Sequence, residues 1–250
     1  MPSKMSSTNE LTLYDLARRH PCSSWSFNPW KTRLILNYKH IPYHAEWVDH
    51  QTLAPTLKIL GLPPNPPGPG GSEYTVPTIR LPDGSHIRDS AVIAKQLEAM
   101  YPDPPLLFDS ETQAMTEQAL GKFARPLMPV FMPRVGRDVI TESSVPFFRE
   151  TRAKAFGMSL EELEASRGGE QAWAAAEPGF QELKALLTEH KRSEGPFVLG
   201  REVSYGDFLI VAFMESLKRI GSDLGERFLD FDESFGRLYQ ACEEWMEKDT

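Results

Sequence analysis

The chain has only two cysteines, Cys22 and Cys242, in 250 residues. Two cysteines cannot build the disulfide framework of a small secreted protein, so a reducing compartment is expected. No apolar run approaches the roughly 20 residues of a membrane helix. The first ten residues, MPSKMSSTNE, lack the apolar stretch of a secretory signal. We therefore expect a cytoplasmic protein that does not enter a membrane.

Positive charge is also scarce, because 27 Lys and Arg face 35 Asp and Glu, which gives a formal net charge of -8. Phosphate binding needs clustered Lys and Arg, so the composition argues against a nucleic-acid partner. It also argues against docking to an anionic membrane surface. The six histidines are scattered without metal-ligand spacing, and no Gly-rich phosphate loop or Gly-x-Ser-x-Gly elbow appears. We expect no metal cofactor.

The N-terminal part alternates strand and helix patterns after a polar segment, residues 1–10, that is expected to be a disordered lead. Residues 11–14 predict a first strand. A helix begins at Asn28-Pro29, because Asn caps free N–H groups and Pro fits the first helical position. The alternation of apolar and polar residues over 43–47 predicts a second strand.

A second set of elements follows a loop rich in proline and glycine, residues 62–72. The pattern predicts a strand, a turn, a strand and a helix, at 74–81, 82–85, 86–88 and 89–101. Two strands joined by a helix, then a hairpin and a covering helix, form the βαβ-ββα arrangement of a thioredoxin-like α/β domain. We place that domain at residues 11–102.

The remainder reads as an all-α domain, residues 110–250, after a linker at 103–109. Two stretches, Ser159–Glu162 and Ser204–Asp207, have the form of a capping box. Three prolines interrupt the first long helix, which is expected to kink or break. The predicted helices are 110–135, 144–157, 159–166, 170–192, 204–221 and 234–248, and the three prolines are Pro126, Pro129 and Pro133.

The segment before the first helix carries candidates for thiol chemistry. A bound thiol is mostly protonated at neutral pH, but a hydrogen bond to a charged group contributes about 1.5–3 kcal/mol, or about one to two pKa units. A helix N-terminus adds about 0.3–1 kcal/mol. Ser26 is best placed to donate such a bond, and Asn28 either orients the sulfur or caps the helix. The alternatives are Ser23, Ser24 and Cys22, the last as a thiol that forms a mixed disulfide.

Two further features suit a peptide ligand. A cis Val76–Pro77 bond would turn the Val76 backbone towards a ligand that adds as a strand, although a proline at a sheet edge needs no role. Asp89 and Ser90 stand where a helix begins, so free N–H groups and the positive end of the helix dipole attract a carboxylate. Asp89 would pair with an adjacent ammonium group, although plain N-capping explains the same residues.

These features occur in the order found in glutathione transferases, which the chain resembles closely. The segments SWSFNPWKTRLILNYKHIPY, YTVPTI and IRDSAVIAKQLEAMYPD are most similar to the fungal etherase-like class and the bacterial lignin β-etherases. The stretches FFRETRAKAFGMSLEEL and FVLGREVSYGDFLIVAFMESLKRI look like the same class. The resemblance covers about residues 11–248 of the chain.

The resemblance implies a homodimer that uses glutathione as its co-substrate and activates the sulfur with Ser26. It implies that Val76, beside cis-Pro77, pairs with the cysteinyl backbone, and that Asp89 and Ser90 hold the γ-glutamyl group. The acid at Asp89 is usually Glu in the wider superfamily, which is a chemically equivalent variation.

Three functions remain open. The leading one is a transferase whose thiolate attacks an apolar, aromatic electrophile by conjugation or β-aryl-ether-type cleavage. The second is a non-catalytic carrier of hydrophobic aromatics, and the third is a Cys22-dependent thiol reductase. His50 and Gln51 either reach the glycine carboxylate of glutathione or are solvated. The side chains that either line the apolar site or belong to the core are Phe123, Met128, Phe131 and Met132.

Overall fold

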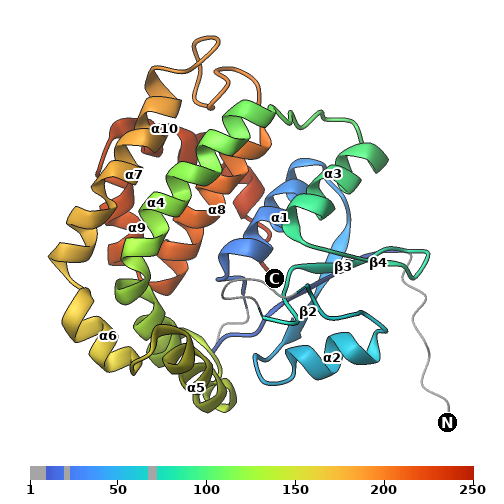
Figure 1. Cartoon of the computed structure of the whole chain (residues 1–250). Coiled ribbons are helices and arrows are strands. Elements are labelled where there is room, and N and C mark those ends of the chain that lie inside the picture. The colour runs from blue at the N-terminus through green and yellow to red at the C-terminus, as the bar shows by residue number, and fades with distance from the viewer. Residues whose placement is uncertain (1–9, 20–22, 67–71) are drawn as a thin grey trace.

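The N-terminal part is built on one four-stranded sheet. The structure, a computed structural model, describes residues 10–19, 23–66 and 72–250. The strand order is β2-β1-β3-β4, in which β1 and β2 are parallel and β3 is antiparallel to both β1 and β4 (Figure 1). The strands are β1 (Leu11–Leu16), β2 (Tyr43–Val48), β3 (Thr78–Arg80) and β4 (His86–Arg88).

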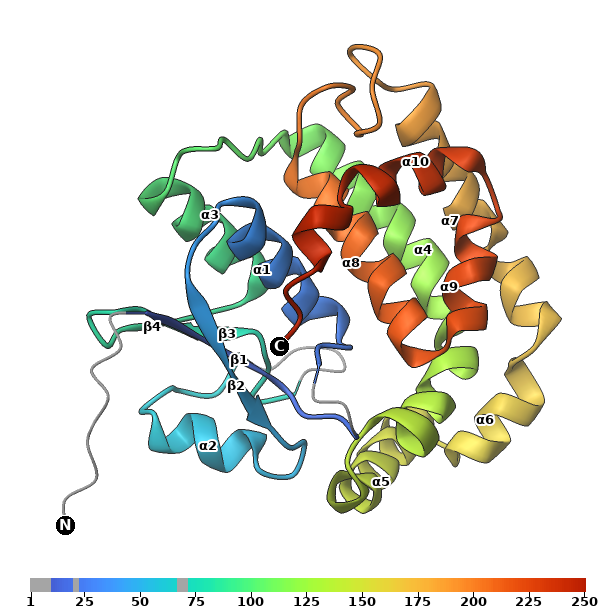
Figure 2. The same ribbon diagram turned by 180° about the vertical axis from the view of Figure 1, so that it is seen from behind.

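Helices cover the two faces of this sheet. The helices α1 (Phe27–Tyr38) and α3 (Ser90–Met100) lie on the face turned towards the helical part, and α2 (Leu53–Ile59) lies on the other side (Figures 1 and 2). Six β1 side chains are buried between these layers. The predicted βαβ-ββα order of a thioredoxin-like domain is confirmed.

Two local predictions for the sheet part were wrong. Helix α2 was not predicted: Leu53 and Leu57 are one helical turn apart in it, but its seven residues are fewer than the 10–12 over which periodicity identifies a helix. The strand expected at 74–81 is paired only over Thr78–Arg80. Pro77 lies just before this strand instead of inside it, in keeping with its lack of a ladder donor.

The C-terminal part is helical throughout, as predicted, and lies against α1 (Figure 2). Its centre is α8, whose side chains are almost all buried. Its elements are α4 (Ser110–Arg134), a π-helical turn (Val135–Val139), a 3-10 turn (Glu142–Ser144), α5 (Val145–Phe156), α6 (Leu160–Arg167), α7 (Glu170–Thr188), α8 (Tyr205–Ile220), α9 (Ser222–Leu229), α10 (Glu233–Ala241) and a second 3-10 turn (Glu243–Met246).

The first long helix was expected to kink or break at its prolines, and it does not break: α4 continues through Pro126, Pro129 and Pro133 to Arg134. Packing against α7 and α8 compensates for the missing N–H donors. The approach to α7 is close: a Cβ atom on Gly179 would lie 2.4 Å from the Phe123 backbone nitrogen. Only glycine fits there, so the α4 backbone is held in place by its neighbour.

Aromatic contacts join the two parts of the chain. Phe27 and Tyr38 of α1 meet Phe213 and Phe208 of α8 edge to face, with ring centroids 5.2 and 5.6 Å apart. Cys242, which ends α10, is fully buried, so it is a core residue as expected. No helix in the described ranges is long and apolar enough to cross a membrane.

Candidate functional site

The strand register brings the candidate segments to one edge of the sheet. Thr78 pairs with both Tyr14 and Arg88. Val76 and Pro77 come directly before Thr78, and Leu16 ends β1 two residues after Tyr14, where the chain continues towards Ser26. Asp89 directly follows Arg88. The sulfur, backbone and γ-glutamyl candidates therefore lie along the same edge.

Ser26 occupies the N-cap of α1 with its side chain available. Its backbone is extended, with φ -89° and ψ 134°, and its hydroxyl makes no capping hydrogen bond. The Ser26 carbonyl accepts the Trp30 N–H at 3.1 Å, so the helix starts at this residue. Within the described ranges the Ser26 hydroxyl has no hydrogen bond to the backbone, so the plainer interpretation does not describe it. A half-buried hydroxyl at a helix N-terminus is the geometry that stabilises a thiolate.

The alternative serines differ from Ser26. Ser24 is fully buried and donates a 2.8 Å hydrogen bond to Asp15, which also pairs with Arg33 at 3.0 Å. Its hydroxyl is therefore committed to the interior. Ser23 is 4% exposed, and its hydroxyl has no partner among the described residues. Cys22 lies outside the described residues.

Three further candidate residues differ in their exposure: Asn28 is exposed, whereas Val76 and Pro77 are buried. Asn28 lies exposed in the first turn of α1. The Val76–Pro77 peptide bond is cis, as expected, and the Val76 side chain is 7% exposed. With its side chain inside, Val76 contributes only backbone groups to the edge.

Asp89 and Ser90 begin α3. Asp89 Oδ1 accepts the N–H groups of Ala91 and Val92 at 2.9 and 3.1 Å, while Oδ2 makes no hydrogen bond within the described ranges. Asp89 has φ 71°, a left-handed conformation that costs a non-glycine residue about 1–3 kcal/mol. N-capping is thus present, and one carboxylate oxygen is still available for a ligand.

The helical part also reaches this corner, which sequence reasoning missed. Tyr205 at the start of α8 is 1% exposed, and its hydroxyl lies beside Ser90. Burial raises the pKa of this phenol, so it remains a neutral hydrogen-bonding group. Its separation from Ser90 in the sequence left no local signal.

Lys31 is a second residue that the sequence did not reveal. Its Nζ lies 4.0 Å from the centroid of the Phe27 ring one helical turn away, and it has no ion pair among the described residues. Burial lowers the pKa of Lys31 to about 8, while the more distant charges of Glu117 and Asp89 oppose that shift. The Lys31 amine therefore provides positive charge near Asp89 at the start of α3.

The loop after β2 is tied to the helical part instead of being solvated. The Ser144 hydroxyl donates to Gln51 at 2.8 Å and accepts from the His50 N–H at 3.2 Å. The Thr141 hydroxyl donates to Asp49 at 2.5 Å. Because the β2 end pairs with the β1 end, this loop closes the same sheet edge on its far side.

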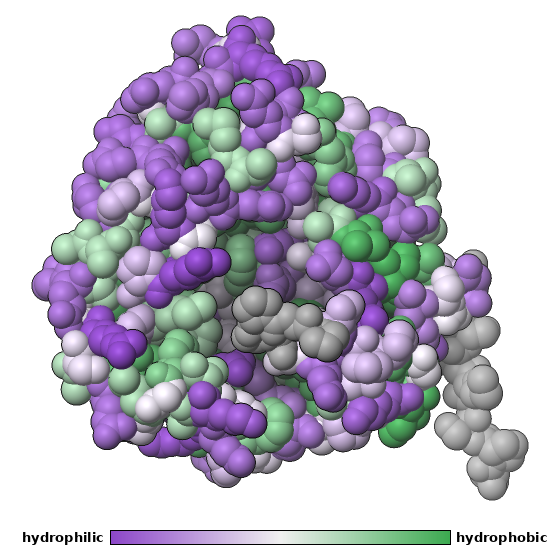
Figure 3. Space-filling view, viewed as in Figure 1, coloured by the Kyte–Doolittle hydropathy of each residue, from purple (hydrophilic) through white to green (hydrophobic). Residues whose placement is uncertain are grey.

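The apolar candidates on α4 separate into two groups. Phe123 and Phe131 are 0% and 8% exposed and pack as core, whereas Met128 and Met132 are half-buried. The face shown in Figure 3 is hollowed where the sheet part meets the helical part. An apolar ligand would find half-buried side chains there, such as Phe27 of α1.

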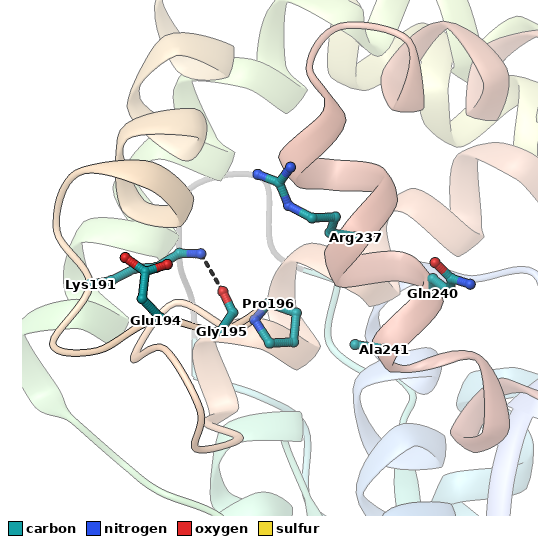
Figure 4. Close-up of a pocket in the computed structure, with 7 residues that line it drawn as sticks. All are labelled: Lys191, Glu194, Gly195, Pro196, Arg237, Gln240 and Ala241. Atoms are coloured by element: carbon teal, nitrogen blue, oxygen red, sulfur yellow. Dashed lines mark hydrogen bonds between the residues drawn. The ribbon is translucent and has the colours of Figure 1, made fainter.

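A pocket of 690 Å³ lies elsewhere, between the 191–196 segment and α10 (Figure 4). Lys191 donates to the Gly195 carbonyl, and Arg237 pairs with Glu233. It contains none of the candidate residues, so it is separate from the site at the sheet edge. Among the described residues, no group of three or more His, Cys, Asp and Glu could hold a metal ion.

The fold and the site together describe a two-part protein. A thioredoxin-like sheet carries the candidate residues at one end of its strands, and an all-helical part lies over that end. A family model for the glutathione S-transferase N-terminal domain matches residues 25–100, and one for the C-terminal domain matches residues 112–245. The chain belongs to the glutathione S-transferase family, and its function is glutathione transferase-like.

Individual relatives agree with this family. The chain is similar to the glutathione S-transferase-like protein ustS of Aspergillus flavus, with 31% identity over 242 residues, 90% of this chain and 86% of that protein. Glutathione transferase GSTFuA2 from Phanerochaete chrysosporium is 30% identical, with a TM-score of 0.85 over 97% of this chain and all of that chain. CsGST63524 of Ceriporiopsis subvermispora, solved in complex with glutathione, is 33% identical, with a TM-score of 0.83 over 95% of this chain and 98% of that chain.

Proposed function

We propose that this chain is a glutathione transferase in which the Ser26 hydroxyl holds the glutathione sulfur as a thiolate. The observation that carries the proposal is a hydroxyl at the start of α1 that makes no hydrogen bond within the described ranges, at the end of the sheet from which Val76 and Asp89 also follow. A hydrogen bond to the thiolate lowers the thiol pKa by about one to two units. That shift makes the thiolate a major form at neutral pH without a buried base.

The rest of the edge suits the remainder of glutathione. The Val76 backbone pairs with the cysteinyl residue as an added strand. Asp89 Oδ2 pairs with the α-ammonium, and the Ser90 N–H and hydroxyl bind the α-carboxylate at the N-terminus of α3. Asn28, exposed beside Ser26, orients the sulfur. The relative from Ceriporiopsis subvermispora, solved with glutathione, supports this ligand.

The second substrate in this proposal is an apolar, aromatic electrophile, which the thiolate attacks by conjugation or by β-aryl-ether-type cleavage. The thiolate forms a carbon–sulfur bond while the leaving group departs with its electron pair. In ether cleavage the leaving group is an aryl oxide, which then takes a proton from water. Half-buried apolar side chains between the two parts of the chain, Phe27 among them, favour such a compound.

Calorimetry and steady-state rates test this proposal. We expect glutathione to bind, and Ser26→Ala to lower kcat/KM for a chlorodinitrobenzene or an aryl β-ether about 10- to 100-fold at pH 7. Cys22→Ser should leave the rate unchanged. Loss of activity only in Cys22→Ser would establish a thiol reductase instead, and tight binding of aromatic dyes without turnover would establish a carrier.

We also propose that the chain forms a homodimer through α3 and α4. Val92 and Met100 on α3 and Met115 on α4 are large apolar side chains that are 54%, 39% and 36% exposed. Sedimentation of the wild type and of Val92→Glu tests the assignment: a dimer that dissociates in the variant supports it, and a wild-type monomer overturns it.

A further inference from the structure

Residues 245–249, which follow α10, lie against the sheet part of the chain (Figure 2). The Asn37 amide of α1 donates to the carbonyls of Trp245 and Lys248 at 2.6 and 3.0 Å. The Lys248 amine donates to the Tyr43 carbonyl at 2.7 Å and lies 3.9 Å from the centroid of the Tyr43 ring. This segment of the helical part is therefore bound to both α1 and β2.

The 245–249 segment also contacts the loop that leads to Ser26. The backbone N–H of Ser24 donates to the Asp249 carbonyl at 2.9 Å. The Ser24 carbonyl accepts a 3.3 Å hydrogen bond from the indole N–H of Trp30, whose backbone N–H bonds to the Ser26 carbonyl. Ser24 and Trp30 are both fully buried. Both backbone groups of Ser24 are thus held, one by the 245–249 segment and the other by α1.

Arg219 of α8 contacts the two residues that hold this loop. Its Nη1 donates to the Asp249 carboxylate at 2.5 Å, and its guanidinium lies over the Trp30 ring, 5.7 Å from the centroid. Its Nε donates to Glu215 at 2.6 Å. Glu215 has a 2% exposed side chain and also accepts a hydrogen bond from Tyr239 of α10. The direction of the guanidinium is therefore fixed from within the helical part.

The loop before α1 depends on such contacts, because it has no helix or strand of its own to hold it. Residues two positions apart in a chain are separated by about 7 Å at most, so a displacement of Ser24 is transmitted to Ser26. A hydrogen bond to a sulfur weakens steeply when its distance and angle change. The Arg219 and Asp249 side chains are only 28% and 18% exposed, which limits the screening of their ion pair by solvent.

We propose that Arg219 and Asp249 are positioning residues, whose ion pair anchors the loop before α1 so that the Ser26 hydroxyl stays at the sulfur of bound glutathione. The inference rests on the proposed function and adds to it a contribution from α8 of the helical part. Both residues act through Ser24 and Trp30 and take no part in bond breaking.

The variant Asp249→Asn tests this inference, because it keeps the backbone carbonyl and removes the charge. We expect the pKa of the bound glutathione thiol to rise by about 0.5–1 unit and kcat/KM for a chlorodinitrobenzene at pH 7 to fall about 3- to 10-fold, since the bond from Ser26 is weakened in part. The rate should recover as the pH rises above the pKa of the free thiol. Asp249→Glu, which keeps the carboxylate, should retain the lowered thiol pKa. A loss of stability alone would lower the rate at every pH and leave the thiol pKa unchanged.

Two further variants isolate the route through Ser26. Asp223→Asn is the matched control, because it makes the same change in the 2.7 Å ion pair between Arg134 of α4 and Asp223 of α9, within the helical part, and it should behave as wild type. In the Ser26→Ala background, Asp249→Asn should raise the thiol pKa no further, because two changes that act through one group are not additive.

The outcomes separate this inference from the proposed function. An unchanged thiol pKa in Asp249→Asn, an equal rise in Asp223→Asn, or a rise that adds to that of Ser26→Ala overturns the positioning role. The proposed function survives each of these results as long as Ser26→Ala alone raises the thiol pKa. If Ser26→Ala does not raise it, the proposed role of Ser26 is overturned as well.

Discussion

Two helices in this chain, α3 and α8, begin with an acidic residue and a serine. They differ in how many of the carboxylate oxygens accept hydrogen bonds from the protein. At α8, Asp207 Oδ1 accepts the Val198 N–H at 2.7 Å, and Oδ2 accepts the N–H and hydroxyl of Ser204 at 2.8 and 2.7 Å. Asp207 is fully buried. At α3, Asp89 is exposed, and only its Oδ1 is hydrogen-bonded by the residues that the structure describes. A capping carboxylate whose two oxygens both accept hydrogen bonds from the protein has a structural role. A capping carboxylate with one oxygen that accepts no hydrogen bond from the protein is suited to bind a ligand.

The sharpest way to separate the two caps is to remove the buried one. Asp207→Ala leaves the N–H groups of Val198 and Ser204 unpaired, so we expect the free energy of unfolding to fall by about 3–5 kcal/mol. Urea unfolding measures this loss. The Kd for glutathione of the fraction that remains folded should not change. A weaker affinity with intact stability would assign Asp207 to the site.

The complementary change is Asp89→Asn, which keeps an acceptor for the α3 N–H groups and removes the charge. We expect the glutathione affinity to fall about 10- to 30-fold, because a charge-assisted bond to the ammonium is lost. The free energy of unfolding should change by less than about 0.5 kcal/mol. Calorimetry and urea unfolding report the two quantities. Unchanged affinity would show that Asp89 is only a cap.

The capping residues also show how far the sequence alone reaches. The box at Ser204–Asp207 and the helix start at Asp89 follow from residue type and spacing, and both are present. The βαβ-ββα order follows in the same way, whereas the cis bond before Pro77 was one of two interpretations of the residues and was implied by the family resemblance. These features depend on residues close together in the chain.

Contacts between segments far apart in the chain could not be predicted from the sequence. Tyr205 beside Ser90 and Arg152 beside His50 join residues about a hundred positions apart, with no shared pattern. The continuity of α4 likewise depends on Gly179 of another helix. Local propensity predicted a kink or a break there, and tertiary packing keeps the helix unbroken.

A third prediction concerns the free energy of unfolding at acidic pH and its dependence on His50, which lies at the β2 side of the sheet. The folded-state pKa of His50 is lowered from 6.5 to about 4, so the unfolded chain binds the proton more tightly. The stabilisation from neutral His50 is present above pH 6.5 and is lost as the pH falls towards 4. We expect this residue to cost about 2 kcal/mol of stability at pH 5 relative to pH 7.

The control for that experiment is His50→Gln, which does not titrate. The difference between the wild type and the variant isolates His50 from the charges that face it, Arg152 and Asp49. Urea unfolding at pH 7 and pH 5 measures both proteins. An equal loss of stability in the two would show that His50 is not responsible.

The smallest expected effect separates the two serines near α1. Ser24→Ala removes the bond to Asp15 in the buried Asp15–Arg33 pair, so it should cost about 1–2 kcal/mol of unfolding free energy. Turnover at saturating glutathione should not change. A large loss of turnover with native stability would move the catalytic role from Ser26 to Ser24.

The most direct measurement is the pKa of the glutathione thiol while it is bound, followed by the ultraviolet absorbance of the thiolate against pH. A hydroxyl at the start of α1 predicts a bound-thiol pKa about one to two units below that of free glutathione, and a return to the free value in Ser26→Ala. Ser24→Ala should titrate as wild type. A lowered pKa that survives Ser26→Ala would contradict the assignment of thiolate stabilisation to Ser26.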